Sequence, residues 1–437
     1  MKGESERMER NSVTYRTYVE ILERELIRAM GCTEPIAIAY CAAKARSVLG
    51  ELPEKVEISA SGNIIKNVKS VVVPNTEGRR GIEVAASVGV LGGDAEAGLL
   101  VIADIPQGIK DHIEAYCDIA DIQVEPMESE SLLDVEISVW ASGHCAKVHI
   151  KDEHTNIVSI EKDGEVIFKK TDAHEADAED GLDYDLLTIR DIFDFATTCD
   201  LSDVKDILDN QIACNKAIAE KGINENFGAN IGKILLKADP DNVRTKAKAM
   251  AAAGSDARMG GCELPVVINS GSGNQGLTTS LPVIVYAEEM GVSREELYRG
   301  LLISNLVTLH AKTGIGRLSA YCGVVTAGAG AAAGIAFIKG GDFKTISHTI
   351  VNTLAISSGI VCDGAKASCA AKIAIAVESG LMGYEMYMNG NQFYSGEGLV
   401  LKGVENTIRN YGYLGRVAMH ETNDEIIRMM INKIQDN

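Results

Sequence analysis

Hydrophobic positions divide the chain into a short helical start, a strand-rich middle and a long helical end. From about Thr14 to Leu49 apolar residues recur at helical spacing, but the sequence MGCTEP interrupts them. Pro35 suits the first turn of a second helix, so Cys32 and Thr33 are expected at the N-terminus of that helix. Free backbone N–H groups and the positive end of the helix dipole would lower the pKa of a thiol there.

The pattern changes between Lys55 and Lys170 to short runs rich in valine and isoleucine, which alternate or stay apolar over strand-like lengths. Glycine, asparagine and aspartate separate the runs, and KDGE within the last run is a hairpin signal. Helical spacing intervenes near residues 80–91 and 107–118. We predict an α+β domain with a mainly antiparallel sheet, whose strands fall within residues 55–61, 70–75, 97–105, 122–127, 134–141, 146–152 and 156–170.

Strands nearly vanish from residue 186 onward, where helical periodicity returns and serine, threonine and aspartate supply N-caps. Abundant glycine and alanine predict helices whose backbones approach closely. We therefore expect an all-α domain over residues 186–437, with residues 1–50 packing against it and the α+β domain of residues 51–170 inserted between them. The acidic residues 171–185, which are poor in large apolar groups, are interpreted as a linker.

Composition and charge narrow the class of protein. A net charge of −20 and an isoelectric point near 4.9 argue against a nucleic acid or an anionic membrane as partner, because both attract clustered lysine and arginine. No secretion signal is evident at the N-terminus, and the longest apolar run, Gly323–Ile338, is shorter than the ~20 residues of a membrane span. We expect a cytoplasmic protein. Its glycine- and alanine-rich helices would suit packing across a two-fold axis, as in a homodimer.

Three of the ten cysteines, Cys322, Cys362 and Cys369, have the spacing C-x39-C-x6-C. Three thiolates on a helical scaffold can hold three corners of a four-iron cluster and leave the fourth iron open. A structural zinc site is less favoured because it usually presents four ligands, with closely paired cysteines. On spacing alone, buried structural cysteines are the more common explanation.

A glycine-rich segment, INSGSGNQG, covers residues 268–276. Backbone N–H groups in such a segment can grip a carboxylate or phosphate if it opens a helix, whereas the simpler alternative is a flexible surface loop. No lysine follows the last glycine, so the segment is not a nucleotide-binding P-loop. A pyridoxal phosphate enzyme with Lys312 or Lys366 as its Schiff-base lysine would leave the cysteines unexplained.

Four motifs together resemble the L-cysteine desulfidase family, which is related to the α-domain of iron–sulfur L-serine dehydratases. They are GCTEP at residues 31–35, VPNT at 73–76, SGSGNQG at 270–276 and SSGIVCDGAKASCAAK at 357–372. The resemblance implies an oxygen-sensitive [4Fe–4S] cluster held by Cys322, Cys362 and Cys369, and conversion of L-cysteine to pyruvate, ammonia and sulfide. In the serine dehydratases the last two cysteines lie further apart and the GCTEP motif is missing, which ranks L-cysteine above L-serine.

The resemblance also implies roles for residues around the cluster. Cys32 is the candidate base for the Cα proton, and Lys366 would offset the charge of the cluster or contact the substrate, although a solvated lysine fits as well. Glu34 would bind the ammonium group or simply stabilise the helix dipole. The candidate substrate-binding residues are Thr33, Glu34, Asn75, Thr76, Ser270, Ser272, Gly273 and Asn274.

Several alternatives stay open. The chain would be an iron–sulfur L-serine dehydratase if water were the leaving group, or a non-catalytic amino-acid-binding protein if no cluster were bound. Asn75 and Thr76 would also fit a simple turn after Pro74. His310 is interpreted as a satisfied core histidine, and Asp363 as the cap of the following helix.

Overall fold

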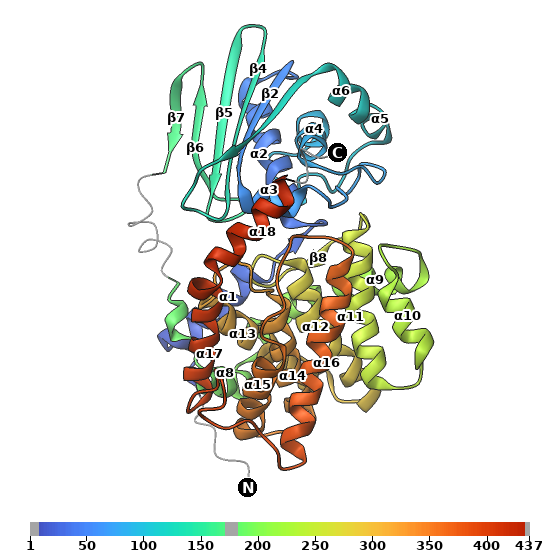
Figure 1. The fold of residues 1–437 in the computed structure, drawn as a ribbon, viewed down its shortest axis with the longest axis vertical. Helices are drawn as coiled ribbons and strands as arrows, with labels where there is room; N and C mark the ends of the chain where they lie inside the picture. The colour runs from blue at the N-terminus through green and yellow to red at the C-terminus, as the bar shows by residue number, and fades with distance from the viewer. Residues whose placement is uncertain (1–7, 171–181, 433–437) are drawn as a thin grey trace.

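A computed structural model describes residues 8–170 and 182–432 of the chain. A sheet with helices on one face lies above a larger assembly of helices (Figure 1). The predicted α+β fold with a helical C-terminal region is confirmed. Most of the predicted acidic linker lies outside the described residues, and its described end forms a short 3-10 turn at Tyr184–Leu186.

The sheet has six strands in the order β3-β2-β4-β5-β6-β7. All neighbours are antiparallel except β2 and β3, which are parallel. A parallel pair needs a long crossover, and here the crossover carries four helices. The strands are β2 Lys55–Ser61, β3 Asp121–Met127, β4 Asp134–Ala141, β5 His144–Lys151, β6 Ile157–Lys162 and β7 Glu165–Lys169, and the crossover helices are α3 Gly62–Val68, α4 Ile82–Gly92, α5 Gln107–Lys110 and α6 Ile113–Ile119.

Two predicted strands, at residues 70–75 and 97–105, are instead mostly buried segments outside the sheet, the second with a 3-10 turn at Gly98–Leu100. Their side chains are apolar because helices and strands cover them, not because their backbones join the sheet. Asn75, with a positive φ of 58°, links the two segments by donating its amide N–H to the carbonyl of Ile102 at 2.7 Å. An apolar run of strand length is therefore not sufficient to predict a strand, because a buried segment can be apolar without pairing in a sheet.

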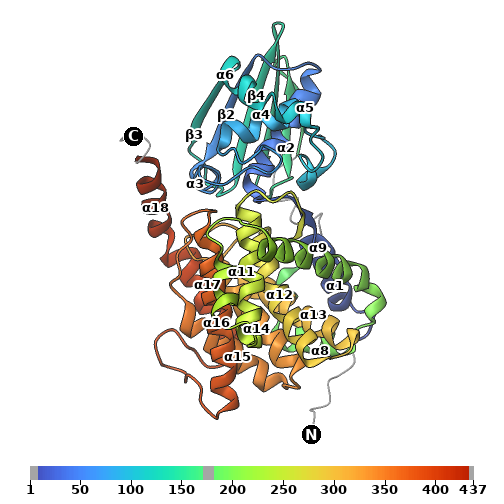
Figure 2. The ribbon, with the colours of Figure 1, turned by 90° about the vertical axis from the view of Figure 1, so that its right-hand side faces the viewer.

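The first two helices pack on different parts of the molecule. Helix α1 (Val13–Glu25) joins the helical assembly, where Tyr15 and Tyr18 make edge-to-face contacts with Phe195 of α8 (Ile189–Thr198). Helix α2 (Thr33–Leu49) instead lies against β4, β5 and α4 (Figure 2). Helix α2 therefore does not follow the expected packing of residues 1–50 on the helical domain. It is buried on nearly all sides.

Helix α14 (Val324–Ile338) forms the centre of the helical assembly and contacts α12, α13, α15 and α16. Its glycines allow close approach: a Cβ atom added at Gly328 would lie 2.5 Å from the carbonyl oxygen of Ala376. The other helices are α9 Lys205–Asn224, α10 Ile231–Ala238, α11 Val243–Met259, α12 Gly273–Met290, α13 Arg294–Thr313, α15 Phe343–Ser357, α16 Ser368–Met388, α17 Val404–Tyr413 and α18 His420–Asn432, with short turns at Gly98–Leu100, Leu201–Asp203 and Leu414–Ala418.

Several elements connect the sheet to the helical assembly. Strands β1 (Arg28–Ala29) and β8 (Val266–Val267) pair antiparallel near the junction, and α18 returns to contact α3 (Figure 1). Arg317, after α13, forms an ion pair with Glu153 from the β5–β6 connection. Within the described ranges we find no helix of the length and apolarity that crossing a membrane requires.

Close packing at α14 generates a stability prediction. Gly328→Ala should lower the free energy of unfolding by about 1–3 kcal/mol, because its methyl group would overlap the backbone of α16. Gly108→Ala is the matched control, since a Cβ atom at this helical glycine would meet nothing within 4 Å. Urea unfolding followed by circular dichroism would compare the two, and equal stability would contradict the packing described for Gly328.

Candidate functional site

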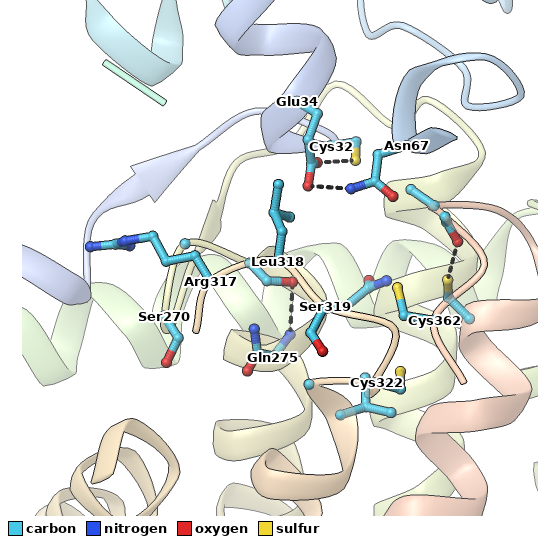
Figure 3. Close-up of a pocket in the computed structure, with 18 of the residues that line it drawn as sticks. Cys32, Glu34, Asn67, Ser270, Gln275, Arg317, Leu318, Ser319, Cys322 and Cys362 are labelled. Atoms are coloured by element: carbon cyan, nitrogen blue, oxygen red, sulfur yellow. Dashed lines mark hydrogen bonds between the residues drawn. The ribbon is translucent and has the colours of Figure 1, made fainter. Parts of the chain in front are cut away.

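One cavity at the junction brings together four cysteines from distant segments of the chain. Cys32, Cys322, Cys362 and Cys369 all line it. In Figure 3 the side chains of Cys32 and Glu34 lie on one side, and those of Cys322 and Cys362 on the other. All four thiols are free, so they are available for ligation or chemistry.

Two loops and a helix start position the three cysteines predicted as ligands. A short antiparallel bridge joins the loops: the backbone N–H of Cys322 donates to Ile360 at 3.0 Å, and that of Cys362 donates to Ala320 at 2.6 Å. Cys369 lies in the first turn of α16. The predicted set therefore meets in one cavity.

Buried positive charges surround these thiols. Lys66 and Lys312 are only 3% and 4% exposed, and neither forms an ion pair among the described residues. A hydrogen bond from Cys322 lowers the pKa of Cys362 to about 5, and both lysines act in the same direction. Burial lowers the pKa of Lys312 to about 8. The hydrogen bond to Cys362 and burial raise the pKa of Cys322, and burial raises the pKa of Cys369. The cavity therefore favours the thiolate at Cys362 and not at these two neighbours.

The donors that the cavity offers to a metal group are thiols, which suit an iron–sulfur cluster. Among residues 8–170 and 182–432, no three histidine, cysteine or acidic side chains stand close enough to hold one metal ion. A four-iron cluster takes cysteine thiolates as its protein ligands. Three free thiols with two buried cations, which would balance an anionic cluster, fit that group.

Cys32 begins α2, as predicted, but its thiol behaves differently from the prediction. Its Sγ donates a hydrogen bond to Glu34 Oε2 at 2.9 Å. Burial and the negative charge of Glu34 raise the pKa of Cys32 well above its ordinary value. The prediction that the helix N-terminus lowers the pKa of Cys32 is therefore wrong, because desolvation and the carboxylate of Glu34 outweigh the helix dipole.

Glu34 is buried yet ionised. Burial alone would raise its pKa, but His154, the Cys32 hydrogen bond, its own backbone N–H and Arg258 outweigh burial and hold the pKa below its ordinary value. Asn67 donates to Oε1 at 3.0 Å and Thr33 donates to Oε2 at 3.2 Å. Cys32 and Glu34 thus share one proton, which rests on sulfur.

The glycine-rich segment opens α12, as the sequence suggested. Ser272 caps the helix, accepting a hydrogen bond from the backbone N–H of Gln275. Ser270, Ser272 and Asn274 line the cavity. Thr33 does not line it, but its hydroxyl donates to the carbonyl of Gly271 at 3.0 Å and so joins the two predicted motifs.

Besides Thr33, four predicted site residues do not line the cavity, namely Gly273, Asn75, Thr76 and Lys366. Asn75 and Thr76 hold the turn behind it: Thr76 donates its hydroxyl to Val73 at 2.7 Å, which fits the turn alternative. Lys366 forms an ion pair with Asp363 at 2.8 Å, so its charge is already neutralised. Asp363 consequently does not cap α16, whose N-cap is Ala367.

His310 and Lys312 have different environments. His310 Nε2 lies 2.7 Å from Glu405 Oε2, as expected of a satisfied histidine. Lys312 lines the cavity instead.

Sequence reasoning missed several residues of the cavity, chiefly Lys66, Asn67, His154, Arg258 and Arg317. Each is a single polar residue in an ordinary helix or turn, and no local motif marks it. Six lining residues carry a buried nitrogen or oxygen atom with no hydrogen-bond partner within the described part of the chain. These atoms are Asn67 Oδ1, His154 Nε2, Arg258 Nε, Asn274 Oδ1, Gln275 Oε1 and the Tyr321 hydroxyl. Such a concentration indicates a binding site for a polar ligand.

Comparisons with known proteins identify the family of the chain. The profile of the family described as serine dehydratase alpha chain matches residues 108–428. A UPF0597 protein of Desulfitobacterium hafniense (strain Y51) is 56% identical over 98% of this chain and 99% of its own length. UPF0597 proteins of Finegoldia magna and Bacteroides fragilis are 48% and 37% identical, over 96% and 95% of this chain and 100% and 97% of their own lengths.

The buried histidine of the cavity makes stability depend on pH. His154 is 6% exposed, and burial lowers its pKa from 6.5 to about 4. The folded protein therefore binds a proton on His154 more weakly than the unfolded chain does. The contribution of the neutral histidine to the free energy of unfolding is fully present above pH 6.5 and is lost as the pH falls toward 4. Between pH 7 and pH 5 the loss should be about 2 kcal/mol.

His154→Gln should remove that part of the pH dependence. Urea unfolding of both proteins at pH 7 and pH 5 would measure it, with His144→Gln, an exposed histidine of β5, as the control. An identical drop in wild-type protein and His154→Gln would contradict the neutral state of His154.

Proposed function

Because the chain belongs to the family of serine dehydratase alpha chains, we propose that it is an iron–sulfur lyase that converts L-cysteine to pyruvate, ammonia and sulfide. The observation that carries this proposal is the meeting of four free cysteines, from segments far apart in the chain, beside the buried carboxylate of Glu34. The profile match supports an amino-acid lyase of the iron–sulfur type, and the GCTEP motif and the six-residue cysteine spacing favour L-cysteine over L-serine.

Cys322, Cys362 and Cys369 would hold a [4Fe–4S] cluster and leave one iron without a protein ligand. When bound, the cluster supplies a Lewis acid whose iron prefers a soft thiolate to a hard hydroxyl as the leaving group. Lys66 and Lys312 would balance the negative charge of the thiolates, a task that the sequence had assigned to Lys366.

Removal of the Cα proton is assigned to Cys32. Its thiol rests protonated, so its proton first passes to Glu34 Oε2 along the 2.9 Å hydrogen bond. The resulting thiolate takes the proton from Cα as the Cβ–S bond of the substrate breaks, and the proton on Glu34 leaves with the sulfide, which restores the resting pair. Asn67 and Thr33 keep the carboxylate oriented toward sulfur. In either protonation state the pair carries one negative charge, which attracts the substrate ammonium.

Ser270, Ser272 and Asn274 would orient the substrate carboxylate at the start of α12. The first turn of this helix offers backbone N–H groups that lack intrahelical partners, and its dipole favours an anion. Gly273 keeps the helix start open for a ligand. An L-serine dehydratase is the second candidate, because the matching family is described by that activity.

Cluster content and substrate preference test the proposal. Anaerobically reconstituted protein should contain iron and acid-labile sulfide, and its kcat/KM for L-cysteine should exceed that for L-serine at least about tenfold. Cys322→Ala, Cys362→Ala and Cys369→Ala should each lose the cluster. Cys145→Ala, a half-buried cysteine of β5 outside the cavity, should retain it.

Two results would overturn this assignment. Faster turnover of L-serine would make the chain a dehydratase, and protein without iron and without product from either substrate would leave only amino-acid binding.

The shared proton of Cys32 and Glu34 generates a second prediction. Cys32→Ala and Glu34→Gln should both keep the iron content of the wild type while kcat falls about 10²–10⁴-fold, because general base catalysis is lost. Iron analysis and steady-state kinetics on the same samples would measure both effects. Loss of iron in Cys32→Ala would make Cys32 a ligand, and wild-type kcat in Glu34→Gln would exclude the proton transfer.

A further inference from the structure

Arg258 is a buried positive charge that forms no ion pair with another residue in the described part of the chain. It lies at the end of α11, is 2% exposed, and lines the cavity. Its Nε atom has no hydrogen-bond partner, and no ion pair involves its guanidinium among the described residues. A buried guanidinium without a partner is costly, so the protein retains this one for a ligand that the structure does not contain.

The guanidinium lies against the start of α12. A Cβ atom added at Gly273 would lie 2.3 Å from Arg258 Nε and 2.8 Å from Cζ. Glycine is therefore required at the first residue of this helix. The charge of Arg258 and the positive end of the helix dipole act at the same point, which favours an anion there.

Glu34 does not serve as the partner of Arg258. Its two oxygens accept hydrogen bonds from Cys32, Thr33 and Asn67, and no ion pair between Glu34 and Arg258 occurs in the described ranges. The cavity thus keeps a carboxylate and a guanidinium that do not contact each other. A zwitterion that carries both charges complements this arrangement.

The second arginine of the cavity is already occupied. Arg317 donates to Glu25 Oε1 at 2.9 Å and to Glu153 Oε1 at 3.1 Å. Both carboxylates line a neighbouring pocket, Glu25 from the end of α1 and Glu153 from the β5–β6 connection. Arg258 is therefore the arginine with free hydrogen-bonding capacity toward a ligand.

We propose that Arg258 binds the α-carboxylate of the substrate, while the ammonium group faces the Cys32–Glu34 pair. The planar guanidinium can donate two parallel hydrogen bonds to a carboxylate, so the site selects α-amino acids with a free carboxylate and rejects the corresponding amines. This inference rests on the proposed function in taking the ligand to be an amino acid. It also completes the set of Ser270, Ser272 and Asn274, since Gly273 links Arg258 to that segment.

Two thiols that cannot undergo the reaction distinguish recognition of the carboxylate from recognition of the amine. 3-Mercaptopropionate keeps the thiol and carboxylate of L-cysteine, and cysteamine keeps the thiol and amine. Calorimetric titration of the anaerobic holoenzyme should show that Arg258→Gln weakens 3-mercaptopropionate about 10–100-fold, as expected for hydrogen bonds to a charged group, and leaves cysteamine within about twofold.

Arg244→Gln is the matched control. Arg244 lies on the same helix but pairs with Glu378 and Glu385 outside the cavity, so both titrations should match the wild type. Gly273→Ala is the second variant, because its methyl group would displace the guanidinium and should weaken 3-mercaptopropionate selectively.

Unchanged binding of 3-mercaptopropionate in both Arg258→Gln and Gly273→Ala would overturn the proposal. So would a variant in which the binding of 3-mercaptopropionate and the binding of cysteamine are weakened equally. This result is independent of turnover. If the wild type fails to convert L-cysteine but needs Arg258 to bind 3-mercaptopropionate, the proposed function fails and the carboxylate site stands.

Discussion

Burial of charge at the junction between the sheet and the helices is the constraint on which the site depends. Lys66, Lys312 and Arg258 are each almost fully buried, and Glu34 is the one carboxylate that lines the same cavity in the described residues. Burying a cation without a counter-charge costs several kcal/mol. The thiolates, the cluster that they fit and an anionic group on the substrate would supply the missing negative charge.

Small residues make this burial geometrically feasible. At Gly276 a Cβ atom would lie 2.0 Å from the carbonyl oxygen of Val267, and Gly273 leaves room for Arg258. These close approaches bring the start of α12 against β8 and the end of α11. On the other wall, the paired loops around Cys322 and Cys362 are fixed by the packed helices α14 and α16. The tight helical packing therefore determines where the charges and thiols meet.

The sequence predicted the parts of this structure that local patterns encode. The alternation in residues 55–61 and 134–141 identified two strands. The glycine-rich segment begins α12, which was one of the two alternatives that the sequence left open. Residues 70–75 are mostly buried but do not pair in the sheet, and their apolar run led to a wrong prediction of a strand. Arg258 and His154 carry no local motif, so only the tertiary structure reveals that they share a cavity.

Cys32 shows the same limit for electrostatics. A helix N-terminus is a local feature and predicted a lowered pKa, whereas burial and the Glu34 carboxylate raise it. Lys366 was chosen for its nearness in sequence to Cys362 and Cys369, but Asp363 binds it, and the cations that face the thiols come from α3 and α13. Charges in a buried site depend on all the elements around it.

The central claim is that Cys322, Cys362 and Cys369 hold a four-iron cluster with one iron open to the amino acid. Mössbauer spectra of the anaerobic protein, recorded with and without L-cysteine, test it most directly. We expect the signal of one of the four irons to change when L-cysteine binds, while the other three stay constant. A spectrum in which no iron responds to L-cysteine, or in which all four irons are equally coordinated by the protein, would contradict the claim.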